Sequence, residues 1–185
     1  MYIIFASFAD ASERTFERRY NVTLHEEISP TTNKEFLRVL KEATSRDVIV
    51  VDIDSPGGMV TVLNEYTKLI NEKDLYIIAT VRQGNLAASC AAVLLNIADK
   101  QVVEPTATVL FHLPFIPLET VKYGIQFFRD ADYSEDFTED HMYLSMDEIL
   151  KEGDDWNSYL MGHDIIYTGE EYMDLYEEVY HDSTS

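Results

Sequence analysis

The chain has 185 residues, of which 46% are hydrophobic, so we expect a single domain over residues 1–185 with a genuine core. Its 14 Lys and Arg residues against 34 Asp and Glu residues give a net charge of −20, which repels phosphate backbones and anionic lipid surfaces. These totals argue against nucleic acid and against a membrane surface as partners.

The cysteine content and the apolar runs bear on the cellular compartment. Cys90 is the one cysteine, so it has no partner for an internal disulfide. The apolar run at residues 2–9 is far shorter than the roughly 20 residues that a transmembrane helix needs, and no basic segment precedes it. We therefore expect a protein of the reducing cytoplasm.

The first predicted elements are a helix and a strand. Residues 33–44 predict an amphipathic helix, because Phe36, Leu37 and Leu40 recur at helical spacing among charged residues. Residues 48–53 follow as a short apolar run rich in β-branched side chains. Such a run is typical of a strand that is buried on both faces in a parallel sheet.

A Ser-Pro-Gly-Gly turn at residues 55–58 begins the next unit. It leads into a second amphipathic helix and then into a strand at residues 75–81. Strand, helix and strand together predict a βαβ crossover. The apolar face of the helix carries Leu63, Tyr66, Leu69 and Ile70.

Gly84 interrupts the chain before an almost wholly apolar stretch at residues 87–98, which predicts a helix buried on every side. Ser89 lies near its beginning. Strand signals return at residues 101–103 and 108–111, and His112 closes the second of these strands. Residues 33–112 thus alternate as a layered α/β fold does.

Beyond Pro117 the chain becomes acidic and aromatic, and helical segments are expected around residues 120–128 and 140–150. These segments predict a projecting subregion. No metal-binding spacing connects the five histidines, and the acidic run at residues 130–136 departs from a calcium-binding loop. No phosphate-binding glycine motif occurs either, so neither a metal nor a cofactor is expected.

A serine at a helix start has unpaired backbone N–H groups nearby, and these can stabilise a developing oxyanion. Ser89 has that setting, and the Gly57-Gly58 turn offers a second backbone that approaches a carbonyl closely. Taken singly, each residue has a structural reading: Ser89 as a packing residue, the glycines as a turn, and His112 as a hydrogen-bonded strand end.

Taken in order, three segments resemble the ClpP peptidase family. Residues 48–58 match a strand ending in Ser-Pro-Gly-Gly, residues 84–89 match the glycine-containing nucleophile turn with one extra residue, and residues 110–112 match a strand ending in His. The resemblance implies a crotonase-like spiral of βαβ units. It divides the chain into a head at about residues 20–113 and a helical handle with a C-terminal segment at about residues 114–185.

The resemblance also implies an active site. Ser89 is the implied nucleophile and His112 the general base, while the N–H groups of Gly58 and Cys90 form the oxyanion hole. Cys90 stands where the family usually has Met. Because a backbone N–H acts there, the replacement leaves that role intact, and Cys90 is not interpreted as a reactive thiol.

The residue that orients His112 has three candidates in the C-terminal quarter. Asn157 ranks first, because residues 157–162 resemble the segment that carries the family's Asp. Asp155 lies close enough to substitute for it. In a rival register Asp164 precedes residues 168–171, which have the form of a helix capping box.

The implied function is an ATP-dependent Clp-type serine endopeptidase subunit that hydrolyses polypeptides. By resemblance it assembles into a heptameric ring or a double heptamer, and an AAA+ unfoldase supplies its substrates. One alternative is a catalytically inactive ring subunit or scaffold. Another is a signal-peptide-peptidase relative with a Ser-Lys dyad, suggested by residues 55–58 and 97–100, although His112 weighs against it.

Overall fold

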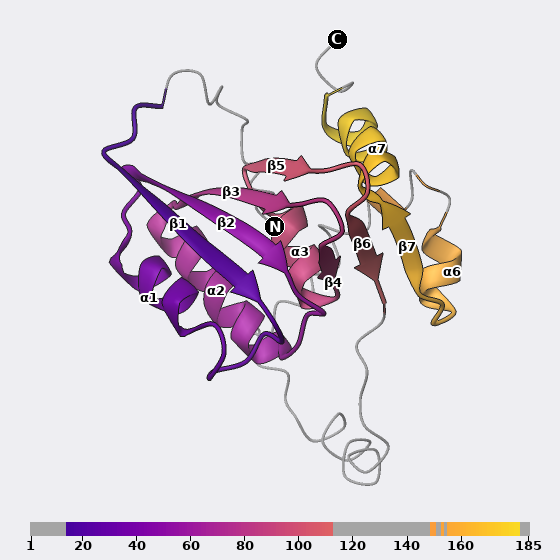
Figure 1. The fold of residues 1–185 in the computed structure, drawn as a ribbon, viewed down its shortest axis with the longest axis horizontal. Coiled ribbons are helices and arrows are strands. Elements are labelled where there is room, and N and C mark those ends of the chain that lie inside the picture. The colour runs from indigo at the N-terminus through magenta and orange to yellow at the C-terminus, as the bar shows by residue number, and fades with distance from the viewer. Residues whose placement is uncertain (1–13, 113–148, 151–152, 154, 182–185) are drawn as a thin grey trace, which may run out of the picture.

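The computed structural model describes residues 14–112, 149–150, 153 and 155–181 (Figure 1). The helical segment expected at residues 120–128 lies outside the described residues, as does all of the one at 140–150 except its last two positions. None of the helices in the described part of the chain is long and apolar enough to cross a membrane.

The larger sheet of the described region has four parallel strands in the order β1-β2-β3-β5. This arrangement confirms the prediction of a parallel sheet. The side chains of Ile49, Val51 and Ile53 are fully buried on one face of the second strand. The strands are β1 at Arg18–His25, β2 at Asp47–Asp54, β3 at Tyr76–Val81 and β5 at Lys100–Val103.

Three helices pack beside this sheet: α1 at Lys34–Glu42, α2 at Val60–Lys73 and α3 at Cys90–Asn96. Figure 1 shows α1 and α2 lying along the same face of β1 and β2. Phe36 of α1 meets Tyr66 of α2 edge to face, with ring centroids 5.0 Å apart. Every residue of α3 is buried, as its apolar sequence predicts.

A second, smaller sheet has the order β4-β6-β7, with β4 at Leu86–Ala88, β6 at Thr108–Phe111 and β7 at Ile165–Thr168. Strand β4 corrects the prediction of a helix over residues 87–98, since α3 begins only at Cys90. Backbone pairing explains the difference: β4 is parallel to β6, and the Ala88 N–H donates to the Ser55 carbonyl at 3.0 Å. These bonds outweigh the helix propensity of the alanines.

Two helices follow in the C-terminal part of the described chain: α6 at Trp156–Leu160 and α7 at Gly169–His181. A capping box starts α7, as the sequence predicts. The Glu171 carboxylate accepts from the Thr168 N–H at 2.8 Å, and the Thr168 hydroxyl accepts from the Glu171 N–H at 3.3 Å. The start of α7 is therefore fixed directly after β7.

A buried polar contact joins α7 to the core. The hydroxyl of Tyr172, which is fully buried, lies 3.0 Å from the Asn96 side-chain oxygen and 2.7 Å from the Gln101 side-chain oxygen. Asn96 ends α3 and Gln101 lies in β5. Since buried polar groups need partners, this cluster specifies how the C-terminal helix packs.

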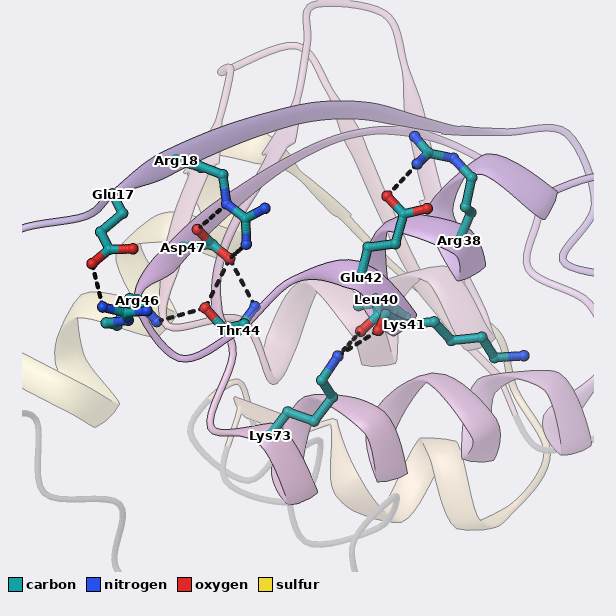
Figure 2. Close-up of polar contacts among 10 residues, drawn as sticks. All are labelled: Glu17, Arg18, Arg38, Leu40, Lys41, Glu42, Thr44, Arg46, Asp47 and Lys73. Atoms are coloured by element: carbon teal, nitrogen blue, oxygen red, sulfur yellow. Dashed lines mark hydrogen bonds and ion pairs between the residues drawn. The ribbon is translucent and has the colours of Figure 1, made fainter.

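The beginning of β2 is fixed by a buried carboxylate. Asp47, only 1% exposed, accepts two hydrogen bonds from the Arg18 guanidinium, at 2.9 and 2.7 Å (Figure 2). It also accepts from the backbone N–H and the hydroxyl of Thr44, at 2.8 and 2.9 Å. The Arg18 hydrogen bond, followed by those of Thr44, lowers the pKa of Asp47 to about 2.

The two outer helices are tied together by Lys73 at the end of α2. Its ammonium group donates to the carbonyl oxygens of Leu40 at 2.9 Å and Lys41 at 2.8 Å, near the end of α1 (Figure 2). A cation at this place also interacts favourably with the negative end of the helix dipole. Lys73 thus links the C-terminal ends of both helices.

Candidate active site

Ser89 stands at a sharp turn between strand β4 and helix α3. Its backbone has φ 54° and ψ −124°, a conformation that costs a non-glycine residue about 1–3 kcal/mol. The turn is held on both sides, because the Ser89 N–H donates to Leu110 O at 2.9 Å and the Ser89 carbonyl accepts from Val93 N at 3.1 Å. Strained strand-to-helix turns of this kind present a serine hydroxyl for nucleophilic attack.

Gly57 packs directly against this turn. A Cβ atom at position 57 would lie 2.6 Å from Ala88 O and 2.6 Å from the Cβ of Ser89. The φ of Gly57 is +90°, which L side chains rarely adopt. Only glycine therefore lets the turn at residues 55–58 approach the nucleophile so closely.

The hydrogen bonds around Gly58 determine where its peptide groups point. Ile28 donates its N–H to Gly57 O at 2.6 Å and accepts from Met59 N at 2.9 Å, which makes Ile28 and Gly58 partners in a parallel bridge. In such a bridge the central residue, here Gly58, directs its own N–H and C=O away from the partner strand. On that other side lies Cys90, whose thiol donates to Gly58 O at 3.3 Å.

Cys90 is the first residue of α3 and its side chain is only 3% exposed. Burial raises the pKa of the thiol, and this effect outweighs the lowering effects of the Gly58 backbone and the Ser89 side chain beside it. A buried thiol with a raised pKa is a poor nucleophile. The backbone N–H of Cys90 lies in the first helical turn, where N–H groups have no partner within the helix.

His112 follows the last residue of β6 and is half-buried. Because β4 and β6 are parallel, with Ala88 opposite Leu110, Ser89 and His112 both lie at the carboxyl ends of adjacent strands. Residues at the carboxyl ends of neighbouring parallel strands share one edge of a sheet, which is where α/β proteins place their sites. The fold thus places the two residues that the sequence proposes as nucleophile and base at the same edge of the smaller sheet.

The register of β6 and β7 bears on the residue that orients His112. Phe111 is opposite Ile165 in this antiparallel pair, and this is the last pair of the ladder. His112 and Asp164 are the next residues beyond it, and continued pairing would set them opposite each other. Asp164 is exposed to solvent.

The other two candidates have different surroundings. Asn157 is exposed in the first turn of α6. The carboxylate of Asp155 accepts from the Tyr167 hydroxyl at 2.8 Å, and burial followed by this hydrogen bond raises the pKa of Tyr167. Tyr167 is opposite Val109, so this pair lies further back along β6 than His112. Of the three candidates, Asp164 is therefore the one that directly adjoins the end of the β6–β7 ladder that His112 also adjoins.

Ser55 takes part in the site although the sequence interpretation gave it no role. It is 1% exposed, and its hydroxyl accepts from Gly57 N at 3.1 Å and donates to Glu26 O.

Lys100, the base of the alternative Ser-Lys dyad, begins β5, four residues beyond the end of α3. Ser89 precedes that helix, which is about 10 Å long, so the helix lies between the two residues along the chain. Within the described residues, no group of three or more His, Cys, Asp or Glu side chains could hold a metal ion.

The Clp protease family model matches residues 7–128, about two-thirds of the chain. A comparison with curated proteins finds no match. The matched range contains Ser89, His112, Gly58 and Cys90, whereas the three candidates for the orienting residue lie beyond it.

Proposed function

Because the chain belongs to the Clp protease family, we propose that it is a serine endopeptidase subunit in which Ser89 attacks a peptide carbonyl. His112 takes the proton of the Ser89 hydroxyl and passes it to the leaving amine, and water then releases the acyl group. The observation that carries this proposal is the strained turn at Ser89, with the Gly57-Gly58 turn packed against it.

The oxyanion of the tetrahedral intermediate is held by the N–H groups of Gly58 and Cys90. The bridge to Ile28 directs the Gly58 N–H toward the side on which Cys90 lies, and the Cys90 N–H opens helix α3. Both donors are set before substrate arrives, so no reorganisation is needed during the reaction. Loss of one such donor typically costs about 10²- to 10³-fold in kcat.

Asp164 orients the His112 ring in this proposal. The support is the β6–β7 register, whose last pair is followed by His112 on one strand and preceded by Asp164 on the other, and the capping box that fixes the chain just after β7. Asp164→Asn is expected to lower kcat about 10⁴-fold, as loss of the orienting carboxylate does in other triads. Asn157→Ala and Asp155→Asn serve as matched variants, and a comparable loss in either one instead of Asp164→Asn would contradict the assignment.

Ring assembly forms the rest of the proposal. Family resemblance supports a heptameric ring or a pair of rings with the head and handle of a crotonase-like spiral, fed by an AAA+ unfoldase that supplies the ATP dependence. Enclosure in a ring would restrict access to unfolded chains. The rival function is an inactive ring subunit, which shares the same fold and assembly.

The test is turnover of short fluorogenic peptides by the purified protein, measured beside its Ser89→Ala variant and its mass in solution. Ring-sized particles with turnover that falls to background in Ser89→Ala are the expected result. A ring whose turnover does not depend on Ser89 would favour the inactive subunit or scaffold. A monomer with Ser89-dependent turnover would support the peptidase activity and contradict the ring assembly.

A further inference from the structure

Ser55 is paired through its backbone with β4, the strand that immediately precedes the nucleophile. Its N–H donates to Leu86 O at 2.7 Å, and its carbonyl accepts from Ala88 N at 3.0 Å, so it forms a parallel bridge with Ala87. Ala88 immediately precedes Ser89. A displacement of Ser55 would therefore disturb backbone pairing that ends one residue before Ser89.

The side chain of Ser55 bonds to different parts of the chain, the backbone groups of Gly57 and Glu26. Its hydroxyl accepts from the Gly57 N–H at 3.1 Å and donates to the carbonyl of Glu26, a residue whose φ is 67°. Ser55 is 1% exposed and Gly57 is also buried, so water has little access to replace the hydrogen bond between them. The hydroxyl thus connects two left-handed backbone positions that lie 31 positions apart in the sequence.

These contacts decide how the Gly58 N–H is aimed. Gly57 is the most permissive residue type, yet here its N–H is held by the Ser55 hydroxyl and its carbonyl by Ile28 N at 2.6 Å. The peptide group that follows Gly57 carries the Gly58 N–H. Fixing Gly57 at both ends therefore fixes that donor relative to Ser89.

We propose that the Ser55 hydroxyl is a positioning group for the oxyanion hole, acting through the Gly57 N–H on the Gly58 N–H. It touches neither the substrate nor the reacting atoms. This inference rests on the proposed peptidase function and extends it to a residue outside the triad and outside the pair of oxyanion donors.

A positioning role makes a prediction that a purely structural role does not. Ser55→Ala leaves the Gly57 N–H and the Glu26 carbonyl without their partner, so the Gly57-Gly58 turn gains freedom. Because only the transition state carries the oxyanion, kcat is expected to fall about 10- to 100-fold with KM within about twofold. The inhibition constant of a peptide boronic acid, which forms a tetrahedral adduct on serine, is expected to rise by a similar factor.

The matched control is Thr44→Val at the other end of β2. It removes a hydroxyl that donates to the carboxylate of Asp47 at 2.9 Å, so it should lower stability without changing kcat or boronate binding. Ser55→Cys is the second variant for the case in which Ser55→Ala does not fold. Its thiol is a weak donor and a weak acceptor, so kcat is again expected to fall while KM is kept.

The results separate the inference from the function on which it rests. Wild-type turnover that depends on Ser89, together with a selective loss of kcat and boronate affinity in the folded Ser55 variant, supports the inference. Folded Ser55→Ala or Ser55→Cys with unchanged kcat overturns the inference alone, as does an equal loss in Thr44→Val. Wild-type protein without Ser89-dependent turnover overturns the proposed function and this inference with it.

Discussion

Substituting alanine for Gly57 would disturb the Ser89 turn without removing the Ser89 side chain itself. The added Cβ would lie 2.6 Å from both Ala88 O and the Ser89 Cβ, and 3.0 Å from Cys90 N. Overpacking of this kind costs about 1–3 kcal/mol, and the left-handed φ of +90° adds about 1–2 kcal/mol. We expect a total destabilisation of about 2–5 kcal/mol, and about a 10²-fold loss of kcat because Ser89 is displaced.

Gly84→Ala separates the two contributions. Gly84 has a φ of +77°, but a Cβ there would meet no heavy atom within 4 Å, so only the backbone cost of about 1–2 kcal/mol applies. Chemical denaturation gives the free energy of unfolding of each variant, and peptide turnover gives kcat. If Gly57→Ala matches Gly84→Ala in stability and retains wild-type kcat, the close packing of Gly57 against Ser89 is refuted.

Two further predictions concern the scaffold. The pKa of Asp47 is lowered from 3.8 to about 2, so its stabilising contribution is present above 3.8 and lost as pH falls through about 2. Asp47→Asn should therefore reduce the free energy of unfolding by about 2–3 kcal/mol at neutral pH and by much less near pH 2. Urea titrations at both pH values measure this, and a difference between variant and wild type that does not depend on pH would contradict it. Tyr172→Phe removes the hydroxyl between Asn96 and Gln101. It should lower the free energy of unfolding by about 1–3 kcal/mol without changing kcat. A urea midpoint equal to that of the wild type would contradict the buried contact.

Most elements of the head could be predicted from the sequence, because their hydrophobic patterns are set by burial. The helix and strand at residues 33–53 and the strand at 108–111 correspond to α1, β2 and β6 within one or two residues. The first strand, β1, was not predicted. Only three of its residues face inward, at least partly buried, while Arg19, Asn21, Thr23 and His25 are exposed.

The error at residues 87–98 has a clear physical cause. Leu86, Ala87 and Ala88 are as apolar as the helix that follows, so hydrophobic pattern alone does not separate strand from helix there. The strand forms because backbone groups of Ser55 and β6 pair with it. Such long-range pairing leaves no local signal, although it is what gives Ser89 its strained turn.

Within the site, the resemblance of three segments, taken in chain order, to the ClpP family was enough to propose Ser89 and His112, but not the residue that orients the histidine. That choice depends on the register of β7 against β6, whose last pair, Phe111 and Ile165, adjoins His112 and Asp164. The capping box at residues 168–171 was the one sequence signal for this register. Ser55 had no such signal, because its role follows from contacts with Glu26 and Gly57 that only the folded chain reveals.

In the proposed mechanism, Ser89 is a nucleophile activated by His112. The most direct test of this mechanism is to treat the protein with a fluorophosphonate probe and locate the adduct by peptide mass spectrometry. We expect an adduct on Ser89 that forms in the wild-type protein and is nearly abolished in His112→Ala. No adduct on Ser89 would contradict the mechanism, and an adduct that forms equally fast without His112 would point to another base, with Lys100→Ala as the next variant to label.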